Sequence, residues 1–162
     1  MQARLYRAED APHLGEIYVR AIRGLAPRGY DAVQVEAWAG RVTTTEETHA
    51  RCSDGRLVLV ATDENDTPIA FMDLEDDGHI DMMFCRPEWS GRGVASALFG
   101  RISAVAADRG MPRLYTEASE IAKPVFGKWG FHLVRRNDME IEGVAIHNYA
   151  MEKHLGGGGV GD

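Results

Sequence analysis

Cysteine and long apolar segments are both scarce in this sequence. Cys52 and Cys85 are the only cysteines among 162 residues, too few for a disulfide framework, and both thiols are expected to be reduced. No apolar run approaches the roughly 20 residues that a membrane-spanning helix needs. The start, Met1-Gln2-Ala3-Arg4-Leu5, has no apolar signal region. These features predict a cytoplasmic protein that does not bind membranes.

Positive charge is also in short supply. The chain has 18 lysines and arginines against 25 aspartates and glutamates, and its formal net charge is -7. This balance argues against the broad basic surface of a nucleic-acid-binding protein. Acidic residues gather around one predicted turn: Asp73, Glu75, Asp76, Asp77 and Asp81. Such a cluster either attracts a cationic amine or is a solvated turn, and both interpretations stay open at this point.

The most informative pattern is an apolar strand that leads into a glycine-rich turn and a helix. The strand reads Ile80-Asp81-Met82-Met83-Phe84-Cys85, and the turn reads Ser90-Gly91-Arg92-Gly93-Val94-Ala95. Apolar residues then recur at three- and four-residue spacing until Gly110 stops the helix. Glycine lets a ligand approach the backbone closely, and the helix start presents unpaired N–H groups and a positive dipole end. The pattern therefore predicts a phosphate or pyrophosphate site.

Two other phosphate-binding motifs are alternative interpretations of this turn. The run Gly91-Arg92-Gly93-Val94-Ala95-Ser96 is one residue short of a dinucleotide-binding fingerprint, and Glu117 ends the next predicted strand. Against this alternative, Arg86 to Ser90 separate the strand from the first glycine, and the chain offers a single β-α-β crossover. A P-loop is excluded because no Gly-Lys-Ser/Thr follows the glycines.

Hydrophobic periodicity predicts a mixed α/β (α+β) fold. The sheet is mostly antiparallel with one parallel crossover pair around the long helix, and helices cover both faces. We expect one domain over residues 1–155 and a flexible glycine-rich tail over residues 156–162. Expected strands cover residues 2–7, 57–61, 69–74, 80–85, 113–117, 133–141 and 144–151, and expected helices start near Asp10, Asp31, Thr44 or Thr45, Val94 and Ala122.

The turn from Ser90 to Ala95 resembles the acetyl-CoA loop of the GCN5-related N-acetyltransferase (GNAT) superfamily. That loop usually reads Gln or Arg, two residues, Gly, one residue, then Gly or Ala, and Ser90 replaces the usual first residue here. The resemblance covers nearly the whole chain and is strongest from Leu57 to Phe131. It implies a GNAT-like fold, acetyl-CoA as co-substrate, no metal, and direct acetyl transfer to a primary amine in a ternary complex.

By the same resemblance, two segments bind acetyl-CoA. The backbone from Met83 to Cys85 would align the thioester, and the N–H of Cys85 would stabilise the oxyanion. Later, Ser119 stands where many relatives carry Asn, and Phe126 stands where many carry the Tyr that protonates the leaving thiolate. Tyr115, Ser119, Tyr149 or water are the candidate replacements. The expected cofactor-binding residues are Met83, Phe84, Cys85, Ser90, Gly91, Arg92, Gly93, Val94, Ala95, Ser96, Ser119 and Phe126.

A general base is needed because an ammonium group cannot attack a thioester. In the histone-modifying branch of the family a Glu stands at the place of Asp81, which makes Asp81 the first candidate. Glu75 is the second candidate and Glu117 the third. His79 is either a turn residue or a catalyst. The alternative for Asp81 is a hydrogen-bonded carboxylate without a catalytic role.

The acceptor is expected to be a small-molecule amine. Tyr30, Trp38 and His147 are the candidate substrate-binding residues, since aromatic rings attract an ammonium group through cation–π contacts. The alternative is that these side chains only pack the core or a lid. A homodimer, common in the resembling family, is a further expectation. Because Ser90 and Phe126 depart from the family pattern, a noncatalytic acetyl-CoA-binding module or sensor is the main alternative function.

Overall fold

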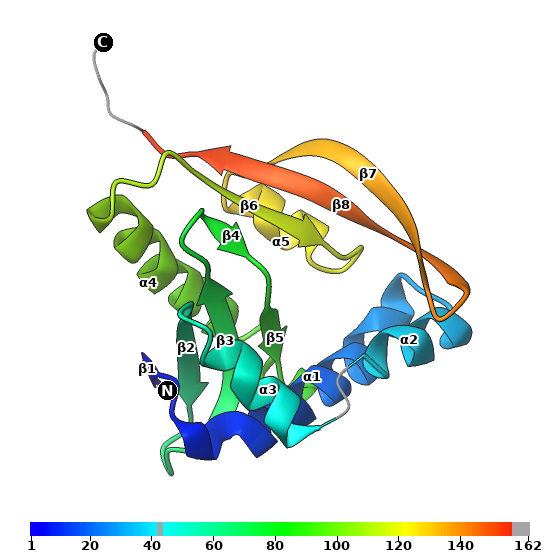
Figure 1. The fold of residues 1–162 in the computed structure, drawn as a ribbon, viewed down its shortest axis with the longest axis horizontal. Helices are drawn as coiled ribbons and strands as arrows, with labels where there is room; N and C mark the ends of the chain where they lie inside the picture. The colour runs from blue at the N-terminus through cyan, green and yellow to red at the C-terminus, as the bar shows by residue number, and fades with distance from the viewer. Residues whose placement is uncertain (42–43, 157–162) are drawn as a thin grey trace.

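The computed structural model describes residues 1–41 and 44–156, and its strands form two four-stranded sheets (Figure 1). The first sheet is antiparallel throughout, with β1 (Gln2–Leu5), β2 (Leu57–Thr62), β3 (Pro68–Leu74) and β5 (Met83–Cys85) in that order. The second has the order β4 (His79–Ile80), β6 (Arg113–Ala118), β8 (Val144–His154) and β7 (His132–Ile141). Only β4 and β6 run parallel among these described strands. The expected mixed fold with one parallel crossover pair is confirmed.

The helices begin near the positions that the sequence predicts, and side-chain caps hold the start of two of them. They are α1 (Ala11–Leu25), α2 (Ala32–Ala39), α3 (Thr45–Cys52), α4 (Val94–Asp108) and α5 (Lys123–Lys128). The Asp31 carboxylate accepts the N–H of Gln34 at 2.8 Å, and the Thr44 hydroxyl accepts the N–H of Glu47 at 3.0 Å. Short 3-10 turns cover Ala8–Asp10, Ala26–Arg28 and Pro87–Trp89. Across the two described ranges, no helix is both long enough and apolar enough to cross a membrane.

The strand expected over residues 80–85 is divided. Residues 79–80 pair with β6 in one sheet, and residues 83–85 pair with β3 in the other. Between them, the Oδ1 atom of Asp73 accepts the N–H groups of Asp81 at 2.8 Å and Met82 at 2.7 Å. A side chain from β3 thus satisfies backbone donors that a continuous ladder would have paired. The single strand was therefore a wrong prediction, and the break is where the two sheets part.

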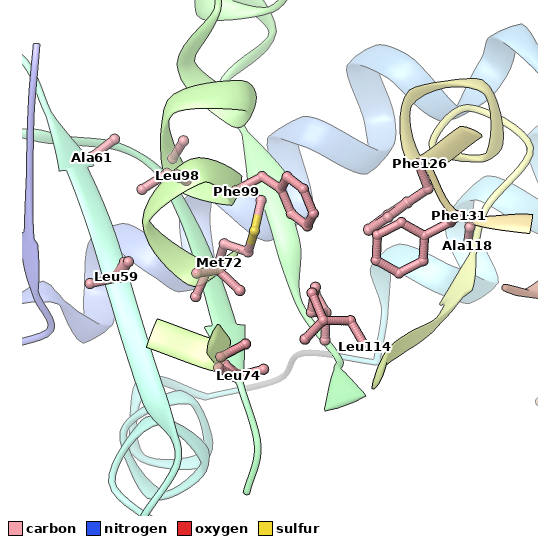
Figure 2. Packing of buried hydrophobic residues seen from close by; sticks show 14 of the residues in the cluster. Leu59, Ala61, Met72, Leu74, Leu98, Phe99, Leu114, Ala118, Phe126 and Phe131 are labelled. Atoms are coloured by element: carbon pink, nitrogen blue, oxygen red, sulfur yellow. The ribbon is translucent and has the colours of Figure 1, made fainter. Parts of the chain in front are cut away.

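The largest core packs α4 against both sheets. Figure 2 shows Leu98 and Phe99 of α4 beside Met72 of β3, with Phe126 of α5 and Phe131 close by. Ring centroids lie 5.8 Å apart for Phe99 and Phe131 and 4.9 Å apart for Phe126 and Phe131. Truncating a buried ring such as Phe99 to alanine costs about 3–5 kcal/mol. This packing fixes the start of α4 relative to the segment before α5.

Of the expected tail over residues 156–162, only Gly156 falls inside the described part of the chain. The remainder of that prediction lies outside the described residues.

Candidate active site

A cavity of about 890 Å³ opens where the two sheets part. Small-molecule sites span about 300–1,000 Å³, so its size suits a large ligand together with a small one. Most of the residues expected from the sequence line it: Tyr30, Trp38, Asp81, Met83, Phe84, Cys85, Ser90, Gly91, Gly93, Val94, Ala95, Ser96, Glu117, Ser119, Phe126 and His147. Glu75 and Arg92 are not among the lining residues. One cavity therefore joins segments that are far apart in the sequence.

The glycine-rich turn forms one end of this cavity. The φ angle is 76° at Gly91 and 83° at Gly93, a left-handed conformation that disfavours any side chain. A Cβ added at either position would meet nothing within 4 Å, so the space beside the backbone is open. Gly93 is the N-cap of α4, and the N–H groups of Val94, Ala95 and Ser96 have no acceptor within the helix. The turn has the geometry of an anion site.

Two basic side chains differ from the sequence-based expectation. The guanidinium of Arg92 lies over the Trp89 ring, 4.3 Å from its centroid, and does not line the cavity. Lys128, at the end of α5, does line it. Arg92 therefore stays a predicted cofactor-binding residue whose side chain lies away from the cavity, and Lys128 is a cation that sequence reasoning missed. Its only sequence signal was its place in the segment that resembles the later cofactor region.

The strand β5 presents its free edge to the cavity. It is the outermost strand of its sheet, and Met83, Phe84 and Cys85 all line the cavity. The N–H of Asp73 bonds to the carbonyl of Met82, and the N–H of Arg86 bonds to the carbonyl of Ile69. Bonded pairs alternate in an antiparallel ladder, so Met83 and Cys85 fall between them and turn their N–H and C=O groups away from β3. Among the described strands these groups have no ladder partner, so they can pair with a ligand.

The Cys85 thiol is a poor nucleophile here. Burial raises its pKa to about 11, and its Sγ–H donates to the carbonyl of Arg86 at 3.4 Å. Because the thiolate is the reactive form, a raised pKa keeps the sulfur inert. Any role of Cys85 in this cavity belongs to its backbone N–H.

Asp81 is held by two arginines. Its Oδ2 atom accepts hydrogen bonds from Arg56 at 3.0 Å and from Arg51. Burial favours the neutral acid, but the positive charges of Arg51 and Arg56 outweigh it and hold the pKa of Asp81 below its usual value. The carboxylate lines the cavity, yet its Oδ2 atom is engaged by both arginines and its lowered pKa makes it a weaker base.

His79 bridges two other carboxylates. Its Nδ1 lies 2.7 Å from Oε1 of Glu75, and its Nε2 lies 2.7 Å from Oε1 of Glu117. Its ring stacks on Tyr115 with centroids 4.7 Å apart. Burial opposes the charged ring, but the two carboxylates prevail and raise the pKa of His79 to about 9. Glu117 lines the cavity and Glu75 does not, so Glu75 is linked to the cavity through His79 and, at 3.5 Å, through Arg56.

At the other end of the cavity, one tyrosine joins two parts of the fold. The hydroxyl of Tyr30 donates to the carbonyl of His147 at 3.0 Å and accepts the N–H of Glu120 at 2.9 Å. Its ring lies 5.7 Å from Trp38, centroid to centroid. The His147 Nε2 lies 2.7 Å from the Glu120 carboxylate. Tyr30, Trp38 and His147 are thus brought together as expected, but Tyr30 is also a structural bridge.

The candidate proton donors to the leaving thiolate are mostly engaged elsewhere. The Tyr149 hydroxyl donates to Glu120, and the Tyr115 hydroxyl donates to Asp77. Neither tyrosine lines the cavity. The Ser119 hydroxyl does, and it accepts the N–H of Ala122 at 3.0 Å, which leaves its own proton available.

Several cavity-lining residues were not predicted. They include Tyr18 of α1, Arg51 of α3, Met139 of β7, and Arg41, which lies just after α2. Tyr18 was visible only as part of the apolar stripe of α1. No local motif marked the two arginines, because they reach the cavity through the packing of separate helices.

A histidine cluster lies apart from the cavity. Within the described ranges, His132, Glu152 and His154 bring one possible ligand atom each to within 4.8 Å of one another, close enough to hold a metal ion. None of the three lines the cavity, and Glu152 also accepts a hydrogen bond from Arg113 at 2.9 Å. The cluster therefore has no place in the chemistry of the cavity.

Comparison with known proteins places the chain in a family. Residues 27–153 match the model of the acetyltransferase (GNAT) domain. The chain is 30% identical to the uncharacterized N-acetyltransferase YafP of Escherichia coli K12 over 151 residues, which is 93% of this chain and 94% of the relative.

Solved structures of acetyltransferases have the same fold as this chain. A GCN5-related N-acetyltransferase from Rhodopseudomonas palustris is 34% identical, with a TM-score of 0.89 and 95% of each chain covered. The putative acetyltransferase yncA of Salmonella typhimurium, solved with acetyl-CoA, shares 18% identity and a TM-score of 0.74 over 100% of this chain and 98% of its own, which shows the common fold. The chain therefore belongs to the GCN5-related N-acetyltransferase family, and it is an acetyltransferase of that type.

Proposed function

We propose that this enzyme transfers the acetyl group of acetyl-CoA directly to a primary amine of a small molecule, with both substrates bound at once. The observation that carries the proposal is that the anion-binding turn and the free edge of β5 open into one cavity. Bringing two reactants together in this way removes much of the entropic barrier to their reaction.

The cofactor side is assigned to the turn and to β5. The N–H groups of Val94, Ala95 and Ser96 would hold the pyrophosphate, with Lys128 as a nearby cation. The outward N–H and C=O groups of Met83 and Cys85 would pair with the amides of the pantetheine arm. The N–H of Cys85 would then face the thioester carbonyl and stabilise its oxyanion.

The proton acceptor is assigned to Glu117 rather than to Asp81. Asp81 is neutralised by Arg51 and Arg56, which lowers its pKa, whereas Glu117 lines the cavity and is oriented by a single hydrogen bond from His79. We assign to His79 and Glu75 a positioning role behind Glu117, because neither has to touch the amine. A water molecule between the amine and Glu117 would complete the path for the proton.

Departure of the thiolate does not require a strong general acid. Phe126 cannot donate a proton, but an unperturbed thiol has a pKa of about 8.5, so the thiolate is a tolerable leaving group. Solvent water protonates the thiolate afterwards, and the Ser119 hydroxyl would donate a hydrogen bond to its sulfur.

The test is a screen of primary amines for release of free CoA from acetyl-CoA, with mass spectrometry of the products. Acetylation of an amine in proportion to CoA release is the expected result. Calorimetric binding of CoA without acetylation of any amine in the panel would contradict the proposal, and would instead support a binding protein.

A further inference from the structure

The end of the cavity away from the glycine-rich turn is mainly apolar. We call it the acceptor end and define it by six lining residues from α1, α2, β5 and β7: Tyr18, Ile22, Trp38, Phe84, Met139 and Ile141. The Phe84 ring lies 4.8 Å from Tyr18 and 6.4 Å from Trp38, centroid to centroid. Trp38, Phe84, Met139 and Ile141 are only partly buried, so apolar surface remains for a ligand to cover.

The hairpin of β7 and β8 brings the last two of these side chains to the acceptor end. Asn137, Met139 and Ile141 all line the cavity, as the two-residue period of a strand requires for one face. The hairpin tip is held beside α2, where the Gln34 side chain donates to the carbonyl of Ala145 at 3.0 Å (Figure 1). The apolar face is therefore built from four separate elements, α1, α2, β5 and β7.

The charged side chains that line the cavity disfavour binding of a ligand with several positive groups. Among the described residues, the carboxylates that line it are Asp81 and Glu117. Asp81 is paired with Arg51 and Arg56, and Glu117 is paired with His79. The basic lining residues are Arg41, Arg51 and Lys128. A second ammonium group on the acceptor would lose its hydration and meet no carboxylate that is free to replace it.

From these two observations, we propose that the acceptor is a primary amine with an aromatic or branched apolar body and no second positive charge. The inference rests on the proposed function and names its substrate class. The apolar body lies against Trp38, Phe84 and Met139, and the amine points toward Glu117. Polyamines and aminoglycosides are excluded by charge.

The experiment compares 2-phenylethylamine and 3-methylbutylamine with spermidine as acceptors at saturating acetyl-CoA. The expected kcat/KM is higher for the two apolar amines by at least about tenfold, the scale on which an apolar pocket discriminates. Trp38→Leu, which keeps an apolar side chain in place, is expected to lower kcat/KM for 2-phenylethylamine several-fold, as is typical of apolar contacts. The KM for acetyl-CoA should stay unchanged.

Two variants that each add a carboxylate test the role of charge at the acceptor end. Met139→Glu places a carboxylate at the acceptor end, and Val33→Glu places one on α2 at an exposed position outside the cavity. Met139→Glu should shift the preference toward spermidine, and Val33→Glu should not. A wild-type preference for spermidine, or equal effects of the two variants, would overturn the proposal while leaving acetyl transfer established. Failure of every amine despite CoA binding would instead overturn the proposed function and this inference with it.

Discussion

The carboxylate of Asp73 replaces a strand partner for Met82. Its Oδ1 atom accepts the Met82 N–H at 2.7 Å, and its Oδ2 atom accepts a hydrogen bond from Arg56 at 2.7 Å. Asp73 is fully buried, and burial raises its pKa to about 6 in spite of these partners. One buried side chain therefore both pairs with Arg56 and satisfies the backbone donors at the point where the two sheets part.

Removing that carboxylate should destabilise the fold. Asp73→Ala removes the buried partner of Arg56, whose side chain is 9% exposed. It also leaves the backbone N–H groups of Asp81 and Met82 without their acceptor. Breaking a buried ion pair on one side costs about 3–5 kcal/mol. Urea denaturation measures the change, and Asp76→Ala, at a side chain that is 91% exposed, is the control. Equal stability of the two variants would refute the role given to Asp73.

Gly93→Asp should weaken binding of the co-substrate. The substitution puts a side chain on a backbone with φ of 83° and a negative charge in the anion site. We expect the Kd for CoA, measured by calorimetry, to rise at least about tenfold, or about 1.4 kcal/mol. Gly100→Asp makes the same change on α4, away from the cavity, and should bind CoA like the wild type. Unchanged affinity in Gly93→Asp would remove the turn from the cofactor site.

The three candidate bases can be separated by isosteric variants. Glu117→Gln should lower kcat by about 10²–10⁴-fold, the usual contribution of a positioned base. Glu75→Gln should have a smaller effect, because Glu75 does not line the cavity and is linked to Glu117 by way of His79. Asp81→Asn should change kcat least, since the Asp81 carboxylate is paired with two arginines, whereas that of Glu117 is paired with His79. Steady-state rates across pH 6 to 10 provide the measurement, and a larger loss in Asp81→Asn than in Glu117→Gln would return the role to Asp81.

His79 should make stability depend on pH. Its pKa is about 9 in the folded protein against 6.5 for the free side chain, so the protonated ring stabilises the fold. This stabilisation is complete below about pH 6.5 and is lost as the pH rises through about 9. The carboxylates that raise the pKa of His79 are those of Glu117, Glu75 and Asp81.

The difference in unfolding free energy between wild type and His79→Gln should therefore be largest near pH 6 and shrink toward pH 10. Denaturation at several pH values measures it, with His13→Gln on the exposed side of α1 as the control. A difference that stays constant with pH would contradict the charged state of His79.

The sequence predicted those features that depend on residues close together in the chain. The caps at Asp31 and Thr44, the helix after Gly93 and the open turn at Gly91 all depend on neighbours in the chain, and they lie where the sequence indicates. The break after Ile80 could not be predicted, because its cause is Asp73 on another strand. The same holds for Lys128 and Arg51, which enter the cavity through tertiary packing, and for the bridge from Glu75 through His79 to Glu117.

The free edge of β5 also affects how the protein behaves without its substrate. An unpaired strand edge is a template for pairing with another chain, and here that edge lines the cavity. A ligand that occupies the edge stabilises the folded state in proportion to the logarithm of its concentration. Any foreign strand that added to the edge would fill the same space. Aggregation through β5 and loss of activity would therefore be a single event, and CoA would suppress both.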